Sequence, residues 1–444
     1  MLTTPESIRT LQRKLYRKAK QEPACRFHAL YDKVYRADIL RYAYDLVRAN
    51  KGSAGIDGVN FADIEAKEGA AAFVAELAET LRSKRYKPDP VKRVMIPKAD
   101  GSQRPLGIPT IRDRVAQMAV KLVIEPIFEA DFCDTSYGFR PRRSAHDAID
   151  DVAHTLHQGY SEVIDADISK YFETIPHAKL MTMVAERICD GALLHLIQMW
   201  LKAPVMEVGA DGTKRNIGGG QGNRKGTPQG GVISPLLSNL FLHLLDRVWE
   251  RRGLQQRLGA RIVRYADDMV VLCRRGTAEP MAVLRQILER MGLSLNEAKT
   301  QVVHAYRGKF GFLGFEIWMA QSRRTGSWYP HVQPSKKSLR TIKDRITRLT
   351  ARTRTLMPVN WIVSELNTVV RGWVGYFHVR NCSKTLTRLR GHLEERMRTQ
   401  LRKRHKIRDR KMGFVRFTER DLYGKYGLYK VPTTAGWTKA HALR

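Results

Sequence analysis

The sequence has few cysteines and no long apolar segment, and these absences exclude several classes of protein. Its five cysteines, Cys25, Cys133, Cys189, Cys273 and Cys382, lie far apart and form no CxxC pair. This spacing argues against a disulfide framework or a zinc site and suits a reducing cytoplasm. No apolar run reaches the roughly 18 residues that a membrane span needs. The N-terminus lacks the apolar segment of a secretory signal.

Acidic residues are scarce relative to basic ones. The chain of 444 residues has 78 Lys and Arg against 44 Asp and Glu, a net charge of +34. Half of this excess lies in residues 335–411, which hold 22 basic and five acidic residues. Such a surface attracts polyanions, of which nucleic acid is the commonest in a cell. A charge that serves only solubility, or attraction to acidic lipid, is the alternative, but no lipidation signal is present.

Helix and strand patterns mix without a strict βαβ order, which predicts an α+β fold for residues 85–320. Helices are expected at 61–83, at 113–130 with Asp113 as N-cap, and from Ser234 as cap with Pro235 in the first turn. Strands are expected on both sides of the turn ADGS, at 162–172 running into a turn, at 261–273 as a hairpin, and at 310–317. Residues 218–231 are expected to form a loop, and the chain from 335 onward to be helical.

Two adjacent acids interrupt the apolar run RIVRYADDMVVLC. A hairpin that turns at Ala-Asp-Asp would place Asp267 and Asp268 at its tip, facing a cleft. The strand end Asp165-Ala-Asp167 puts two more carboxylates on one face, because side chains alternate along a strand. Three carboxylates from two strands can hold two Mg²⁺ ions about 4 Å apart, as in polymerases, and all-oxygen ligands favour Mg²⁺ or Mn²⁺. For the aspartate pair alone, a solvated turn or general acid–base chemistry is the alternative.

An ordered set of motifs resembles the reverse transcriptases, and among them the proteins encoded by bacterial group II introns. IDADISKYF and RYADD are similar to the family's catalytic boxes, and KGTPQGGVISPLLSNLFL to the box before the catalytic hairpin. Two segments resemble fingers motifs of the family, IPKADGSQRPLGIPTIRDRVAQ and SYGFRPRRSAHDAI. Two others resemble the last boxes of the palm, LSLNEAKT and FGFLGFEI. The maturase domain, also called domain X, is resembled by LNTVVRGWVGYFHVRN. Together the motifs cover roughly residues 50–430. A YADD sequence alone would be weak evidence, but the ordered set of motifs is specific to the family.

The resemblance implies roles for individual residues. Asp167, Asp267 and Asp268 would be the catalytic metal ligands, with the backbone carbonyl of Ile168 as a further oxygen. Asp167 is preferred to Asp165 because the family's aspartate precedes a hydrophobic residue and, five places on, an aromatic one, here Phe172. Phe172 would stack under the sugar and exclude a 2′-hydroxyl, so that dNTPs are preferred. A core Phe at a strand end is the alternative.

Polar contacts to the incoming dNTP are implied in the same way. Lys98 and Arg104 would pair with the triphosphate, because guanidinium and ammonium groups suit phosphate oxygens. Gln229 would line the nucleotide pocket, and Lys299 would protonate the leaving pyrophosphate. Judged by residue type alone, Lys98, Arg104 and Lys299 would be solvated surface charges, and Gln229 would be a glutamine in a turn.

The basic helical region would meet structured RNA through phosphates and shape. The expected RNA contacts are Arg371, Arg388, Arg390, Arg402, Lys403 and Arg404. Stacking on unpaired bases is open to Trp361, Trp373, Tyr376 and Phe377, but their helical spacing favours a place in the core. The motif RGWVGYF is expected to hold the domain together and to expose Arg371.

The resemblance implies a right-hand polymerase of the α+β class. An N-terminal extension with the start of the fingers is expected at 1–84, fingers and palm with an antiparallel sheet at 85–325, and a helical thumb and maturase domain at 326–411. Residues 412–444 would form a short segment with room for a small DNA-binding role. Some relatives end in a metal-binding endonuclease domain. No such Cys and His cluster stands before Arg444, so a nick or replication fork supplied by other factors is expected to start DNA insertion.

The expected function is RNA-directed DNA synthesis coupled to binding of group II intron RNA and help with its splicing. Two Mg²⁺ ions are the expected cofactor, with Mn²⁺ as a substitute. The expected partners are intron RNA, a DNA target or primer and dNTPs, in a bacterial cytoplasm, with no membrane and with a dimer as one open possibility. The alternatives are a domesticated relative in phage defence, DNA repair or CRISPR spacer acquisition, and a pure RNA-binding splicing cofactor.

Overall fold

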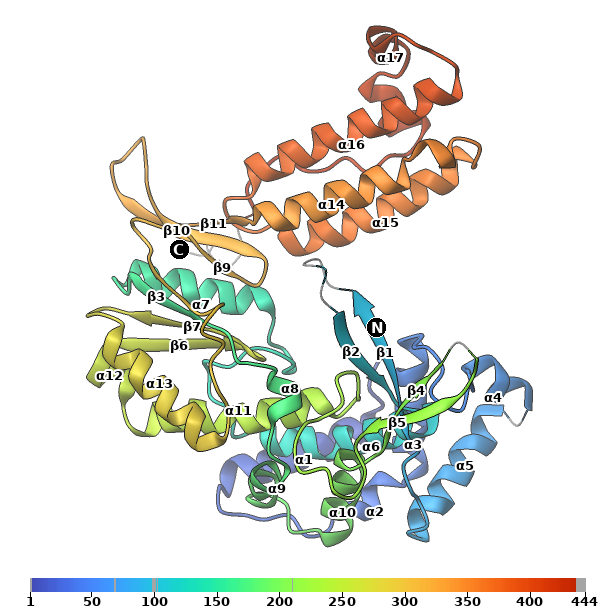
Figure 1. Ribbon diagram of the computed structural model, residues 1–444, viewed down its shortest axis with the longest axis vertical. Helices are drawn as coiled ribbons and strands as arrows, with labels where there is room; N and C mark the ends of the chain where they lie inside the picture. Colours follow the sequence, from blue (N-terminus) through green and yellow to red (C-terminus); the bar gives the residue numbers. More distant parts are fainter. Residues whose placement is uncertain (1, 68, 98–100, 102, 210, 437–444) are drawn as a thin grey trace.

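The computed structural model describes residues 2–436 apart from 68, 98–100, 102 and 210. Figure 1 shows N-terminal helices with a first sheet at one end, a central sheet flanked by helices, a small third sheet, and a bundle of long helices at the other end. Helices and mainly antiparallel sheets are mixed along the chain, so the expected α+β class is confirmed. Within the described residues, no helix is long and apolar enough to cross a bilayer.

Of the N-terminal helices, the first three pack on the long helix α6 (Ile111–Glu129), while the fifth packs on the third and the fourth packs on the fifth. In chain order these helices are α1 (Glu6–Gln21), α2 (Tyr31–Val34), α3 (Ala37–Ala49), α4 (Phe61–Lys67) and α5 (Gly69–Arg82). The single helix expected at 61–83 is wrong, because the backbone breaks at Gly69, which has a φ of +75°. The expected cap of α6 is also wrong. Thr110 is the N-cap and accepts the backbone N–H of Asp113, which lies inside the first turn.

The first sheet has the strand order β2-β1-β4-β5. Its strands are β1 (Val91–Pro97), β2 (Gln103–Ile108), β4 (Val205–Val208) and β5 (Lys214–Gly218), and helices α9 (His177–Ala185) and α10 (Gly191–Leu201) precede β4. β1 and β2 pair antiparallel with Val94 opposite Leu106, so the two strands expected on either side of ADGS are confirmed. Most of the turn itself lies outside the described residues.

The central sheet is antiparallel, with the order β6-β7-β3-β8. Its strands are β3 (Glu162–Ala166), β6 (Ala260–Tyr265), β7 (Asp268–Cys273) and β8 (Gln301–His304). Alternate side chains enter two separate cores. Ile164 and Val271 pack with α11 (Ser234–Arg251), α12 (Leu254–Leu258) and α13 (Ala278–Met291), whereas Val163 and Val270 pack with α7 (Ala145–His157). Burial on both faces explains why these strands read as continuous apolar runs.

The cap expected for α11 is wrong by one residue. Ile233 is the N-cap and makes no side-chain cap bond, while Ser234 is the first helical residue. Ser234 is buried with its hydroxyl against Gly231, where a Cβ would lie 2.6 Å from Ser234 Oγ. Pro235 stands in the first turn as predicted, where its missing N–H costs nothing.

The small third sheet connects the central part to the bundle. Its strands are β9 (Phe310–Phe312), β10 (Phe315–Gln321) and β11 (Trp328–Pro334), in the order β11-β10-β9. The single strand expected at 310–317 is therefore wrong. Leu313 and Gly314 have φ values of +49° and +82°, and they turn the chain back on itself.

The helical bundle has its own hydrophobic core. It contains α14 (Lys336–Leu349), α15 (Val359–Phe377), α16 (Ser383–Arg404) and α17 (Arg410–Arg416). The following segment adds Phe417, Leu422, Leu428 and Val431 to that core, and Gly436 forms a β-bridge with Arg380. Residues 412–436 therefore belong to the bundle rather than to a separate unit, while Trp437 lies outside the described residues.

Candidate functional site

The paired aspartates stand at the tip of the hairpin that joins β6 to β7. Tyr265 lies opposite Asp268, so Ala266 and Asp267 form a two-residue turn. Ala266 has a φ of +57°, in the left-handed region that favours glycine. Asp167 directly follows β3, whose last residue, Ala166, lies opposite Met269. Continued by one residue, this register brings Asp167 opposite Asp268 at one edge of the sheet.

The carboxylates at this edge affect one another's protonation. Burial raises the pKa of Asp268 to about 6, and the charges of Asp267 and Asp167 add to the rise. Burial also raises the pKa of Asp165 to about 6, with Asp268 and Asp167 as the next causes. The pKa of Asp267 is raised by burial, while the Arg104 charge opposes that rise. Crowded carboxylates of this kind are stabilised by a cation placed among them.

The donor set fits a hard divalent ion. Every side-chain donor at this edge is a carboxylate oxygen, and oxygen ligands select Mg²⁺ or Mn²⁺ over softer metals. Within the part of the chain that the structure describes, no three Asp, Glu, His or Cys side chains are arranged so that they could hold a metal ion together. Asp167 instead faces Lys299, with Nζ 3.6 Å from Oδ2. Lys299 and Arg104 offset part of the charge of the carboxylates, and a bound cation would offset more of it.

The backbone beside Asp167 is fixed by the segment that follows α13. The Asp167 carbonyl accepts the Asn296 N–H at 2.7 Å, and the Ser169 N–H donates to the Ser294 carbonyl at 2.9 Å. Between them, Ile168 forms an isolated bridge with Leu295 and is buried. The expected family motif LSLNEAKT therefore positions the end of β3.

Only some of the predicted nucleotide contacts lie at this edge. Arg104, on β2, is close enough to oppose the rise in the pKa of both Asp267 and Asp268. The Gln229 carbonyl accepts the Gly107 N–H at 2.6 Å, which ties the glycine-rich loop to β2. Phe172, in the short helix α8 (Tyr171–Thr174), packs half-buried against the core. Lys98 lies outside the described residues.

The sequence interpretation missed the group that supports the hairpin, Arg264. This side chain is completely buried and pairs with Asp246 of α11, which is equally buried, at 2.5 Å. Arg264 Nη1 donates to the carbonyl of Ala266 at 2.9 Å and to Asn239 Oδ1 at 3.0 Å. Nη2 donates to Ser136 Oγ at 2.7 Å. The only sequence signal was an arginine inside an otherwise apolar strand.

Asn239 and Gly138 complete the set of contacts behind the Ala266–Asp267 turn. Asn239 Nδ2 donates to the Gly138 carbonyl. A Cβ on Gly138 would lie 2.3 Å from the Ala266 nitrogen, so only glycine lets the two backbones meet. Arg264, Asn239 and Gly138 thus join α11, β6 and the 136–138 segment behind the aspartates.

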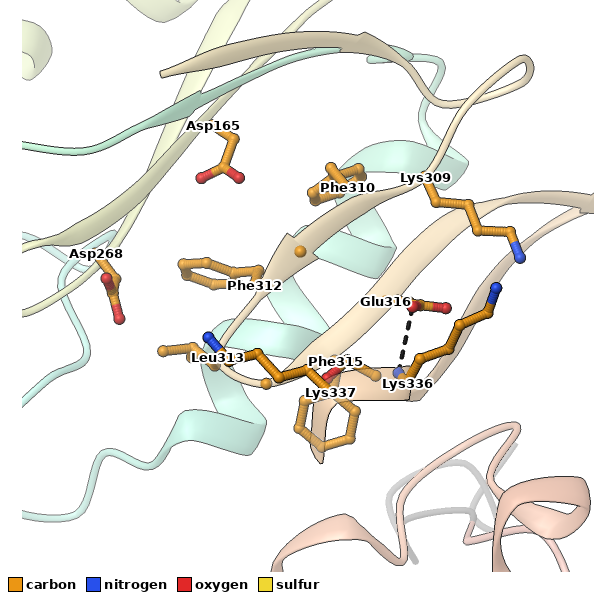
Figure 2. Close-up of a pocket in the computed structure, with 13 residues that line it drawn as sticks. Asp165, Asp268, Lys309, Phe310, Phe312, Leu313, Phe315, Glu316, Lys336 and Lys337 are labelled. Carbon is orange, nitrogen blue, oxygen red and sulfur yellow. Dashed lines mark hydrogen bonds between the residues drawn. The ribbon is translucent and has the colours of Figure 1, made fainter. Parts of the chain in front are cut away.

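A pocket of about 540 Å³ opens between the carboxylate edge and the third sheet. Figure 2 shows Asp165 and Asp268 on one side of it, with Phe310 and Phe312 projecting toward them from β9. Lys309 and Lys336 lie on the other side, whereas the side chain of Lys337 extends toward Asp268. The pocket therefore joins the acidic edge to a basic rim at the start of α14.

The predicted RNA contacts divide into free and engaged side chains. Arg388 and Lys403 are exposed, and Arg371 is exposed with its guanidinium over the Tyr429 ring, 5.3 Å from the ring centroid. Arg390 pairs with Glu394 and Glu419, each at 2.8 Å, Arg404 donates to the carbonyls of Thr355 and Met357, and Arg402 donates to the Arg408 carbonyl. The expected core position of Trp361 is wrong, because its side chain is 60% exposed, whereas Trp373, Tyr376 and Phe377 do pack.

Comparisons with known proteins agree with this architecture. The model of the reverse transcriptase (RNA-dependent DNA polymerase) family matches residues 96–317. The model of the group II intron maturase-specific domain matches residues 339–416. The first match runs from the end of β1 through the central sheet into β10, and the second lies within the helical bundle.

Individual relatives support the same assignment. Protein YkfC of Escherichia coli K12 is 35% identical over 353 residues, which cover 71% of this chain and 90% of YkfC. The group II intron-encoded protein LtrA of Lactococcus lactis is 35% identical over 224 residues, which cover 50% of this chain and 35% of LtrA. A 91 kDa protein of the cob intron of Schizosaccharomyces pombe is 24% identical over 423 residues. With the aspartates at one sheet edge and a maturase-type bundle beyond it, the chain belongs to the group II intron family of reverse transcriptases with a maturase-specific domain.

Proposed function

We propose that this protein is an RNA-directed DNA polymerase that binds group II intron RNA, assists its splicing and copies it into DNA with Mg²⁺. The observation that carries the proposal is the register of β3 against β7, which pairs Ala166 with Met269 and supports a place for Asp167 beside Asp268 at the hairpin tip. Asp167, Asp267, Asp268 and the Ile168 carbonyl would hold the ions. Bound there, two divalent ions would lower the pKa of a primer 3′-hydroxyl and stabilise the leaving pyrophosphate.

The protein's own residues would position the remaining reactants. Arg104 reaches the carboxylate edge from β2 and would hold the triphosphate of a dNTP, with Lys98 as its proposed partner. Phe172 and Gln229 would shape the sugar and base side of the pocket. Lys299, which contacts Asp167, would deliver a proton to pyrophosphate. A DNA primer or target is the proposed second substrate.

The test separates polymerisation from RNA binding. Asp267→Asn and Asp268→Asn should each lower primer extension on an RNA template by about a thousandfold, because each removes a ligand charge where the reaction develops negative charge. Binding of intron RNA and splicing assistance should be retained, because the bundle has a separate core. Unchanged extension in both variants would refute the catalytic assignment. Joint loss of splicing would refute the division of roles.

A further inference from the structure

The glycine-rich loop that carries Gln229 is joined by backbone hydrogen bonds to the segment that carries Phe172. The Thr227 N–H donates to the Phe172 carbonyl at 2.7 Å. The Gly226 N–H donates to the Ile175 carbonyl at 2.8 Å. The two sides proposed for the sugar and the base of the nucleotide are therefore connected through positions 226 and 227.

One side chain reinforces this connection, the imidazole of His177 at the start of α9. His177 Nε2 lies 2.6 Å from the Gly226 carbonyl oxygen. Because a carbonyl oxygen only accepts, Nε2 carries the proton and donates it to this bond. The His177 backbone N–H donates to the Arg224 carbonyl at 2.9 Å. His177 thus holds the loop at two points, one on each side of Lys225.

The buried imidazole makes no second polar contact within the described chain. His177 is only 7% exposed, and its Nδ1 has no hydrogen-bond partner among the described residues. A buried nitrogen without a partner costs stability. An apolar side chain would avoid that cost, so packing alone does not favour histidine at this position. The feature that distinguishes the histidine is its bond to Gly226.

The loop backbone at Gly226 benefits from this restraint. Gly226 has a φ of +92°, in the region that favours glycine. A Cβ built there would lie 3.1 Å from the Glu173 carbonyl oxygen, so the loop passes close to α8. Glycine leaves the backbone free to adopt other conformations. A hydrogen bond to its carbonyl from a buried side chain removes much of that freedom.

Phe172 depends on the loop for one of its two anchors. The first anchor is its neighbour Tyr171, which is buried and donates its hydroxyl proton to the Ser238 carbonyl at 2.6 Å. The rings of Tyr171 and Phe172 meet edge to face, with centroids 5.4 Å apart. Helix α8 has only four residues, so its own hydrogen bonds hold it weakly. The second anchor is the Thr227 N–H, which directly follows Gly226 in the loop.

We propose that His177 is a positioning residue for sugar discrimination, because its bond to Gly226 fixes the loop that holds Phe172. The inference rests on the proposed polymerase function, in which Phe172 excludes a 2′-hydroxyl. A ribonucleotide differs from a deoxyribonucleotide by one oxygen atom, so its exclusion needs a ring held to within about 0.5 Å. A looser loop should admit ribonucleotides before it prevents the addition of deoxyribonucleotides.

The test compares His177→Asn with His177→Gln in the full-length protein. The amide nitrogen of glutamine corresponds in reach to imidazole Nε2, whereas that of asparagine corresponds to Nδ1 and falls short of Gly226. The measurement is the kcat/KM for dATP divided by that for ATP, on an RNA template with a DNA primer. His177→Asn should lower this ratio about tenfold, a loss of about 1.4 kcal/mol of discrimination. His177→Gln should keep it within about threefold of the wild-type ratio.

The ratio separates positioning from a general loss of stability, because a smaller folded fraction lowers both values of kcat/KM equally. His177→Leu tests the proposal a second way. Leucine fills the buried space without a donor, so it should lower the ratio as much as asparagine does. Thr227→Val is the matched control in the same loop. The Thr227 hydroxyl is buried without a partner in the described chain, and valine keeps the backbone donor to Phe172, so the ratio should not change.

A wild-type ratio in both His177→Asn and His177→Leu would overturn the inference. An equal fall in His177→Gln and His177→Asn would also overturn it, because the position of the donor would then not matter. Wild-type protein that adds neither nucleotide would refute the proposed function instead.

Discussion

The catalytic edge of the central sheet and the helical bundle manage charge in opposite ways. At the edge, four carboxylates crowd together, and one buried arginine behind them makes several fixed hydrogen bonds. On the bundle, many basic side chains lie at the surface, and among the described residues Arg388 and Lys403 form no ion pair. Chemistry at a reacting atom needs fixed geometry, whereas adhesion to RNA can be spread over many contacts. Single substitutions should therefore have large effects at the edge and small ones on the bundle.

The sharpest test of this contrast is Arg264→Met. Removing one partner of a buried ion pair leaves Asp246 charged and unpaired, so the free energy of unfolding should fall by about 3–5 kcal/mol. Arg261→Met is the control on the same strand, because Arg261 pairs with Asp151 at 2.9 Å but is partly exposed. The control should lose less, because solvent reaches this pair and Tyr137 OH still donates to Asp151. Urea denaturation measures both, and equal losses would remove the claimed distinction.

Low pH should reduce the free energy of unfolding through His243, which lies near the Arg264–Asp246 ion pair. Burial lowers the pKa of His243, on α11, to about 4, although Asp246 opposes the shift. The unfolded chain binds this proton near pH 6.5 and the folded chain near pH 4, so stability falls as the pH drops between those values, by at most about 3 kcal/mol. His243→Gln should remove this part of the pH dependence. Urea denaturation at pH 7.5 and pH 5 provides the measurement, and an unchanged slope in the variant would contradict the assignment.

The smallest effects are expected on the bundle. Arg388 and Arg390 lie on the same helix and allow a matched comparison of two variants. Arg390→Ala should lower the free energy of unfolding by about 1 kcal/mol, because it breaks the ion pairs with Glu394 and Glu419. Arg388→Ala should leave stability within about 0.5 kcal/mol. Its effect should appear in RNA affinity, with the salt slope reduced by about one. The reverse pattern would show that the engaged arginine, not the free one, meets RNA.

Most of the architecture could be predicted because it depends on local patterns. The apolar runs, the break at Ala-Asp-Asp and the glycine-rich loop all appeared as expected. The errors have local and distant causes. The cap of α6 is a local choice between Thr110 and Asp113, three residues apart. Arg390 is engaged both by Glu394, one turn along its own helix, and by Glu419, 29 residues away. Trp361 shares the helical spacing of core residues, and only the packing of the bundle leaves it outside.

The catalytic support was hidden for the same reason. Arginine at position 264 interrupts an apolar strand, and nothing local shows that Asp246, Asn239 and Ser136 converge on it. A buried charge is tolerable only where such partners are supplied from several segments at once. The residue types of the aspartate site could thus be anticipated, whereas the scaffold that aims them could not.

The bundle core also has a practical consequence for dividing the chain. The maturase-specific match ends at residue 416, yet Phe417, Leu422, Leu428 and Val431 are buried among α14, α15 and α16. A fragment cut at that boundary would expose apolar surface on α15 and α16 and would tend to aggregate. An expression fragment of the bundle should therefore extend at least to Gly436, where the bridge to Arg380 closes the unit.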